Sequence, residues 1–468
     1  AHRTKGSMYV LRWSPRLIRF CVASAFALLA VAVGGPAAGQ AQDVALRGFV
    51  VDAETGRPLV GANVVLRRLA VGRLPRGAVT NGDGYYRVAG LAPGERYALR
   101  VSFVGYRTVH DTLYVAEGEE RVTRSFRLRA TERALEEVVV TGEASEGAML
   151  EAARQQVAAA DIARIPTPSV SGDLAGYLQL LPGMVMTGDR GGQLFIRGGT
   201  PDQNLVLMDK MPVYRPFHIV GFYSAFPQDL ISRAEIYAGG FPAEYSGRIS
   251  SVIDVEMRGG NQERFEAAAT AGPFLTGVRA EGPLSGAGLS LLAAARFSQI
   301  ERTAPRFLGQ EQPLKFGDRF VKLQHATETG RCAVTGLHTY DRGRIDVERD
   351  DVFRWSNFAF GGRCVGVTSG SSSVVDVSTS VSYVSNAAGR GDEPERQASL
   401  WHVNTSANLV APLEGRSEIR GGFHARVNKL AYSLGEKFQG FRTGHAFMLD
   451  IVGYASATLP LGRSLDVR

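Results

Sequence analysis

The chain has 468 residues, and 53 Lys and Arg against 46 Asp and Glu give it a formal net charge of +7. This length is sufficient for several domains. The basic residues are scattered along the sequence, which argues against a nucleic-acid-binding protein because phosphate neutralisation needs clustered Lys and Arg. The three cysteines are too few for a small fold held together by disulfides.

Residues 1–41 predict a secretory signal peptide preceded by a few upstream residues. We take Met8 as the start; a positively charged stretch follows, and then the apolar run 20–33. Ala41 is a small residue suited to cleavage before the next position. The alternative is a membrane anchor, but the run is shorter than the roughly 20 residues of a spanning helix. We therefore expect an exported bacterial protein.

Residues 42–129 predict a small β-sandwich. Short strands alternate with the turn clusters 52–56 and 80–84, where Asp and Asn can bond their own backbone and Gly adopts positive φ. The pattern in residues 48–64, followed by the second cluster, resembles the carboxypeptidase regulatory-like domain, a non-catalytic accessory of some zinc peptidases. The only histidine here is His110, so the ligand set of a zinc peptidase is missing. We expect a periplasmic module.

Residues 130–160 predict an interaction strand and a linker. The strand is rich in β-branched residues and consists of Glu136, Glu137, Val138, Val139, Val140, Thr141 and Gly142. Such a segment between a folded module and a loose linker can add to the exposed sheet edge of a partner. It resembles a TonB box, the segment that TonB pulls to transmit energy from the inner membrane. A last strand of the sandwich or a plain linker strand are the alternatives, and the segment that follows favours the box.

Residues 161–260 predict an α/β domain, with a helix that Ser171 caps and that ends at Leu181. Three ordered motifs here resemble the plug domain of TonB-dependent outer-membrane receptors. Their key residues are Arg197, Gly198, Gly199, Asp209, Pro212, Val213, Glu235, Gly239, Gly240 and Arg248. Lys210 stands where the family usually has Gly, so a turn that needs positive φ would be strained there.

Three charged plug residues are expected to hold the plug to the barrel wall: Arg197, Glu235 and Arg248. Ordinary solvated charge is an equally weighted alternative for each of them. The glycine pairs end strands where the backbone must turn sharply or approach another surface, as a plug packed inside a barrel requires.

Residues 261–468 predict the first part of an antiparallel transmembrane β-barrel. Segments such as 375–383, 401–409 and 419–427 put apolar residues on one face and polar residues on the other, as in a strand with lipid outside and water or plug inside. A soluble sandwich would show the same alternation. Segment lengths and the preceding plug favour the barrel. We count about ten strands, whereas plugged transporters close with about 22. We therefore expect a truncated barrel; a complete soluble protein with a novel sheet is the alternative.

Two side-chain pairs within this segment are candidates for special roles. If residues 341–356 form a hairpin loop, Cys332 and Cys364 lie nearly opposite each other and both face outward. A disulfide in the oxidising periplasm and two separate small residues are the two interpretations. His402 and His424 face the expected lumen, where contact with substrate or metal competes with plain polar lining, the commoner role.

The sequence therefore predicts a TonB-dependent receptor of the bacterial outer membrane with its N-terminal sandwich in the periplasm. The resemblance implies several partners: the TonB–ExbB–ExbD complex, outer-membrane lipid, a surface lipoprotein, and a scarce nutrient of the siderophore, vitamin, glycan or peptide class. We find no catalytic motif, and we expect no enzyme activity, no cofactor and no metal site. An adhesin or binding protein without transport is the main alternative, and a cell-surface enzyme with a regulatory module is another. The box and plug motifs weigh against both.

Overall fold

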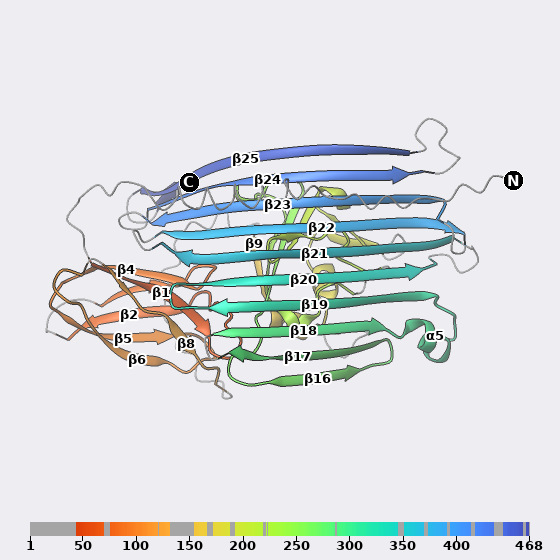
Figure 1. The fold of residues 1–468 in the computed structure, drawn as a ribbon. Helices are drawn as coiled ribbons and strands as arrows, with labels where there is room; N and C mark the ends of the chain where they lie inside the picture. The colour runs from red at the N-terminus through yellow and green to blue at the C-terminus, as the bar shows by residue number, and fades with distance from the viewer. Residues whose placement is uncertain are drawn as a thin grey trace.

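The computed structural model places three domains along the chain: a small sandwich, a central domain and a long curved sheet (Figure 1). The structure describes residues 44–69, 75–119, 121–131, 154–165, 172–187, 192–218, 221, 223–285, 288–344, 351–368, 373–390, 394–412, 417–434, 443–461 and 465–467. The predicted signal peptide and the predicted TonB box, residues 136–142, lie outside these ranges. No helix in the described ranges is long and apolar enough to span a membrane.

The N-terminal domain is a sandwich of two four-stranded sheets, as predicted. One sheet contains β1 (Val44–Asp52), β4 (Tyr85–Leu91), β7 (Arg121–Thr123) and β8 (Phe126–Leu128). The other has the order β3 (Arg76–Val79), β2 (Asn63–Arg68), β5 (Arg96–Ser102) and β6 (Val109–Tyr114). Alternate positions of the facing strands are apolar, and they form a shared core that includes Leu46, Val64, Tyr86, Leu99 and Leu128.

The central domain is built around a five-stranded mixed sheet in the order β13-β12-β15-β14-β9. Its strands are β9 (Arg154–Ala158), β12 (Asn204–Met208), β13 (Met211–Pro212), β14 (Ile231–Tyr237) and β15 (Ser251–Met257). Between them lie α3 (Ala159–Ala163), α4 (Leu174–Gln179), the hairpin of β10 (Met184–Thr187) and β11 (Gln193–Ile196), and the short helices η1 (Pro201–Gln203) and η2 (Gln228–Leu230). The expected α/β domain is therefore confirmed.

The start of helix α4 differs from the prediction. Its N-cap is Asp173, whose Oδ1 accepts the amide of Ala175 at 2.9 Å, so the predicted cap at Ser171 is wrong. Aspartate and serine are comparable N-caps. Only the tertiary position of Asp173, which also accepts the amide of Ser224, distinguishes the two.

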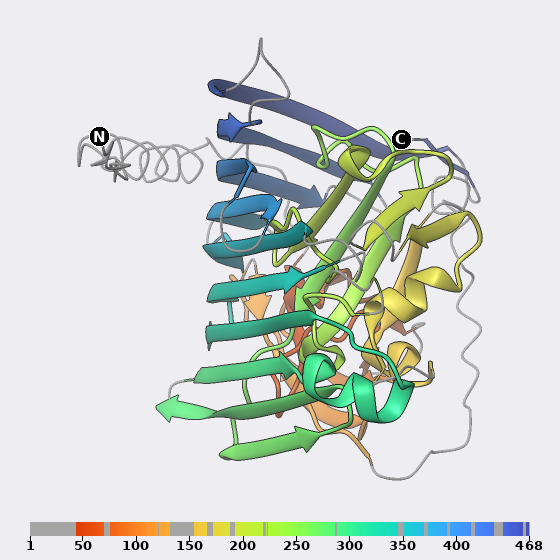
Figure 2. The same ribbon diagram turned by 90° about the vertical axis from the view of Figure 1, so that its right-hand side faces the viewer.

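The third domain, here called the wall sheet, is an antiparallel sheet in which each strand pairs with its neighbours in sequence. Its strands are β16 (Glu266–Ala271), β17 (Leu275–Ser285), β18 (Leu289–Ser298), β19 (Leu314–Ala326), β20 (Gly330–Gly343), β21 (Asp351–Val367), β22 (Val374–Arg390), β23 (Arg396–Pro412), β24 (Glu418–Ser433), β25 (Thr443–Leu461) and β26 (Leu465–Val467). These are 11 strands, against the ten or so expected. Helix α5 (Ile300–Leu308) fills the connection between β18 and β19. Figure 2 shows the sheet curving around the central domain.

The two faces of the wall sheet have opposite chemistry. The convex face exposes large apolar side chains such as Phe360, which is 48% exposed, and Trp401, which is 40% exposed. The concave face buries polar ones, including Asp318, Ser380 and Asn404. A soluble sheet would bury its apolar face instead, so this arrangement is that of a transmembrane barrel wall. The fold predicted from the alternation is confirmed.

Cys332 and Cys364 are directly opposite each other on β20 and β21. Their Cα atoms are 4.1 Å apart, and the structure joins their sulfurs in a disulfide. Both residues lie on the exposed face, as Phe358 and Phe360 do.

Candidate functional site: the interface between the central domain and the wall sheet

The central domain is attached to the wall sheet by a histidine between two aspartates. His218 lies in the loop after β13, and its Nδ1 is 2.8 Å from Oδ2 of Asp341 while its Nε2 is 2.9 Å from Oδ1 of Asp318. Both carboxylates occupy inward-facing positions, on β20 and β19. The imidazole also stacks on Phe316, with ring centroids 4.1 Å apart. A loop of the central domain is thus held by two neighbouring wall strands.

The charge of His218 follows from this environment. Burial lowers the pKa of His218, but Asp318 and Asp341 outweigh burial and raise it to about 10. The imidazole is therefore doubly protonated at neutral pH; its Nδ1–H donates to Asp341, and its Nε2 side forms an ion pair with Asp318.

Arg296 extends the same network to helix α4. Its guanidinium is 2.7 Å from Asp318 and 3.3 Å from Asp173, and it also donates to the carbonyl of Ser224. Burial raises the pKa of Asp173, and Arg296 opposes that effect. The N-terminus of α4 and the loop that carries His218 are consequently anchored through one shared wall carboxylate.

A second attachment point is the turn between β12 and β13. Asp209 and Lys210 have φ values of 49° and 67°, and Met208 pairs with Met211, which defines a two-residue hairpin turn with both central residues left-handed. Asp209 accepts the Nζ of Lys322 at 2.9 Å and the hydroxyl of Thr335 at 2.8 Å. The turn thus presents a buried carboxylate to an inward-facing lysine of β19.

Lys210 adopts the left-handed conformation that its position in the motif predicts, although a β-carbon makes it costly. Its Nζ bonds to Asp254 at 2.5 Å and to the hydroxyl of Tyr245 at 3.2 Å. These bonds hold the side chain against the central sheet and compensate the backbone strain.

Further polar contacts surround these two points. Arg258 makes a bidentate pair with Glu281, at 2.5 and 2.7 Å, and Asp229 pairs with Arg279 at 2.8 Å. On the other side, the main chain of Pro212 accepts the hydroxyl of Ser382 at 2.7 Å. The described interface is therefore polar over most of its length, with an apolar patch at wall residues Leu292, Phe320, Leu337 and Ala359.

The charged residues predicted to join plug and wall do not do so in the described contacts. Glu235 pairs with Arg154 at 3.0 Å inside the central domain, Arg248 donates to the carbonyl of Gly247, and Arg197 is exposed. Arg197 is also left-handed, with φ 48°. The role of these three residues at the wall therefore stays a prediction, because motif position gives no information on which side chains face the wall.

Glycine is required at two of the motif positions for different reasons. Gly239 has φ 106°, a conformation that L side chains rarely adopt. At Gly199 a Cβ would lie 2.1 Å from the hydroxyl oxygen and 2.5 Å from the β-carbon of Ser250, so any side chain there would displace Ser250. Gly198 and Gly240 are also left-handed, and Pro212 and Val213 are buried.

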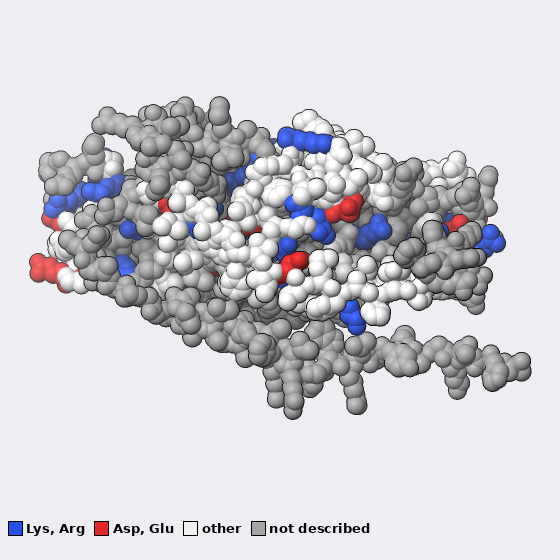
Figure 3. All heavy atoms as spheres, turned by 90° about the horizontal axis from the view of Figure 1, so that it is seen from above, with Lys and Arg blue, Asp and Glu red and all other residues white. Residues whose placement is uncertain are grey.

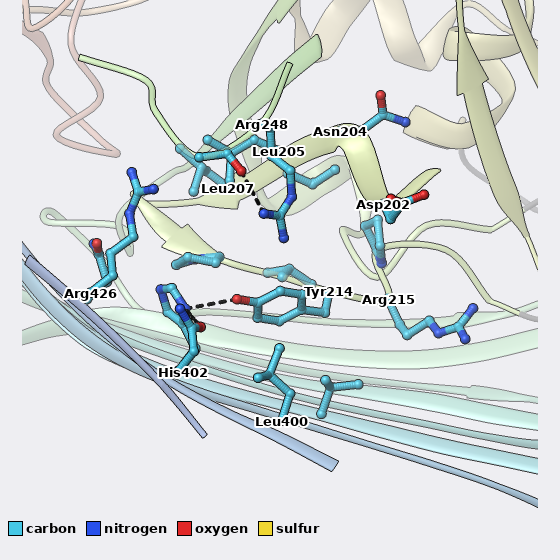
Figure 4. Close-up of a pocket in the computed structure, with 18 of the residues that line it drawn as sticks. Asp202, Asn204, Leu205, Leu207, Tyr214, Arg215, Arg248, Leu400, His402 and Arg426 are labelled. Atoms are coloured by element: carbon cyan, nitrogen blue, oxygen red, sulfur yellow. Dashed lines mark hydrogen bonds between the residues drawn. The ribbon is translucent and has the colours of Figure 1, made fainter. Parts of the chain in front are cut away.

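A cavity of about 940 Å³ lies between the central domain and β22 to β25. Figure 4 shows Tyr214 at its centre, with its hydroxyl bonded to Nδ1 of His402 at 2.9 Å. Guanidinium groups approach it from both domains, namely those of Arg215, Arg248 and Arg426. His424 also lines the cavity, but no group of three metal-binding side chains occurs in the described ranges.

Charge is mixed on the described part of the face that Figure 3 draws. Figure 3 shows the face seen from above, where basic and acidic side chains are interspersed among uncharged ones over the coloured atoms. This view shows no basic stripe of the kind that nucleic acid needs.

Comparison with known proteins identifies two of the domains. The family model for the carboxypeptidase regulatory-like domain matches residues 45–129, and the model for the TonB-dependent receptor plug domain matches residues 149–252. The chain contains the plug domain of a TonB-dependent receptor. The central domain, residues 154–257 as described, is thus the plug.

Solved structures are similar to the chain at low sequence identity. The siderophore receptor PirA from Pseudomonas aeruginosa is 17% identical, with a TM-score of 0.47 over 65% of this chain and 53% of that chain. A variant of the ferric enterobactin receptor PfeA from Pseudomonas aeruginosa is 15% identical, with a TM-score of 0.48 over 65% and 55%. The copper transporter OprC is 13% identical, with a TM-score of 0.50 over 65% and 53%. The chain spans about half the length of these structures. No curated sequence matches it.

Proposed function

We propose that the protein is a TonB-dependent transporter that takes up a scarce nutrient across the outer membrane. The observation that carries the proposal is the polar attachment of the plug to the wall, through His218, Asp209 and Arg258. Charged groups that separate regain hydration, so such an interface can open and close more readily than an apolar core. A plug that must move in each transport cycle needs an interface of this kind.

The proposed point of force is the segment Glu136–Gly142. It lies between the end of the described sandwich at Thr131 and the start of β9 at Arg154. Strand β9 is the edge strand of the plug sheet and pairs only with β14 among the described strands. Tension on the segment therefore acts directly on an edge of the plug, where strands can be removed one at a time.

The proposed cargo is a small nutrient of the siderophore, vitamin, glycan or peptide class. The cavity of about 940 Å³ is within the size range of small-molecule sites, roughly 300–1,000 Å³. PirA is named as a siderophore receptor, PfeA as a ferric enterobactin receptor and OprC as a copper transporter, so the similar structures are all named for small cargo.

The test is a titration of the full-length receptor with the periplasmic domain of TonB. Val139→Pro should abolish binding, because proline removes a main-chain donor from the added strand. Ala148→Pro, in the same segment but outside the proposed box, is the matched control and should bind as the wild type does. Equal binding by both variants would exclude the box at this position, and no binding by the wild type would favour an adhesin without transport.

A further inference from the structure

The sandwich is docked on one rim of the wall sheet. It lies at the end of the strands opposite helix α5 (Figure 1), where the connections between wall strands are short. The hydroxyl of Ser125 donates to the carbonyl of Glu328 at 2.6 Å, and Arg47 donates to the carbonyl of Thr368 at 3.0 Å. The sandwich therefore contacts two successive rim turns rather than hanging from its linker.

An apolar contact supports this docking. Phe49 and Tyr85 of the sandwich form one buried cluster with Val365 and Val374 of β21 and β22. Phe49 is 4% exposed and Tyr85 is 7% exposed. Two aromatic side chains of a small domain would otherwise face water, so their burial favours the docked position.

A charge cluster then joins the sandwich, the plug and the wall at a single point. We call Asp83, Arg233, Glu256, Arg331 and Arg363 the junction cluster. Asp83 of the sandwich is 3.2 Å from Arg331 and 3.3 Å from Arg363 of the wall. Glu256 of the plug is 3.2 Å from Arg331 and 2.8 Å from Arg233.

The sandwich also contacts the plug directly. Arg233 of β14 donates to the carbonyl of Gly82, next to Asp83. Burial raises the pKa of Glu256, but Arg233 and Arg331 outweigh it and hold the pKa well below its usual range. Glu256 thus stays ionised at neutral pH, and the carboxylates of the cluster depend on its arginines for compensation.

Chain order connects this junction to the point of pulling. The segment that precedes the plug leaves the sandwich just after β8 and enters the plug at β9. Arg154, the first residue of β9, pairs with Glu235, and Glu235 lies 3.8 Å from Arg233 of the junction cluster. Force applied between Thr131 and Arg154 therefore acts on the sandwich and the plug at once.

We propose that the N-terminal sandwich is a periplasmic gate: docked on the rim, it holds the plug closed through the junction cluster, and it must leave the rim before the plug moves. This proposal rests on the proposed function, since it assumes that TonB moves the plug. It gives the sandwich a role that its family resemblance does not supply.

The test uses a removable lock in the full-length receptor in outer membranes. Ser125→Cys with Glu328→Cys joins sandwich and rim, in a background where Cys332→Ala and Cys364→Ala prevent wrong pairing. Plug opening is read from labelling of Ala234→Cys by a thiol reagent, because Ala234 is fully buried in the plug core. We expect TonB-driven labelling to fall to the level without TonB when the lock is oxidised, and to return after reduction.

A second variant needs no disulfide. Asp83→Asn removes both ion pairs to the wall, and we expect labelling of Ala234→Cys in the absence of TonB to become about tenfold faster. Asp111→Asn, an equal charge change at an exposed site on β6, should leave the rate unchanged.

The outcomes separate the two proposals. TonB-driven labelling that persists with the lock closed would overturn the gate and leave the transport proposal intact. An unlocked receptor that shows no TonB-driven labelling would overturn the transport proposal, and the gate with it. Equal labelling rates for Asp83→Asn and Asp111→Asn would also overturn the gate.

Discussion

Replacing His218 by glutamine should loosen the plug from the wall by a predictable amount. Glutamine is neutral, so it can donate a hydrogen bond to Asp341 but cannot replace the ion pairs that the imidazolium makes with Asp318 and Asp341. Two carboxylates then share one site, with Arg296 as a compensating cation beside Asp318. Breaking a buried charge pair by removing one partner costs about 3–5 kcal/mol.

The pH dependence gives a second measure of the same interaction. The pKa of His218 is about 10 in the attached plug against an ordinary value of 6.5, so protons favour attachment. The stabilisation of plug attachment by protonated His218 is fully present below about pH 6.5 and is lost as the pH rises through about 10. The shift in pKa corresponds to about 3–5 kcal/mol. The variant lacks the group, so its attachment should not share this loss.

The assay is an equilibrium urea titration of the full-length receptor at pH 7 and pH 10.5. Fluorescence of Trp355 on the wall reports release of the plug, because the guanidinium of the plug residue Arg215 lies 5.2 Å from its ring and leaves when the plug separates. His110→Gln, an exposed substitution in the sandwich, is the control. Equal midpoints for His218→Gln and wild type at pH 7, or an equal pH effect on both, would refute the reasoning.

Three other variants, two single and one double, test separate parts of the structure. Lys322→Met should lower the free energy of plug release, measured by urea titration, by about 3–5 kcal/mol, because it leaves the buried carboxylate of Asp209 without its lysine partner. Lys315→Met, at an exposed wall site, should change this free energy little. Lys210→Gly should relieve backbone strain of about 1 kcal/mol yet destabilise the plug overall in thermal unfolding, since the ion pair lost is the larger contribution. Cys332→Ala with Cys364→Ala should destabilise the wall by about 2–4 kcal/mol and so lower its thermal midpoint, measured by heat-dependent gel mobility. An unchanged midpoint would count against a structural disulfide.

Local patterns predicted the architecture well because they depend on neighbouring residues. Alternation along each wall strand identified its lipid face, and hairpin symmetry placed Cys332 opposite Cys364. The turn clusters of the sandwich likewise mark real strand ends, such as the turn before β4. These features follow from side-chain period and turn chemistry within a few residues.

The plug attachment could not be predicted in the same way. His218 meets Asp318 and Asp341 only when a loop and two strands come together in space. One signal was available: both aspartates, and Lys322, stand at inward-facing positions of their strands, where a charge needs a partner. For the motif residues Arg197 and Arg248, the sequence gave no indication of whether the side chain faces the wall sheet.

The central claim is that force on the segment before β9 removes part of the plug while the wall stays intact. The most direct measurement is force spectroscopy of the full-length receptor in outer membranes, pulled through a bound TonB domain. The account predicts an extension of roughly 100 Å, as about 30 residues from the start of β9 to the start of β10 become extended at about 3.3–3.6 Å each, before TonB detaches. Detachment of TonB with no prior extension would contradict it.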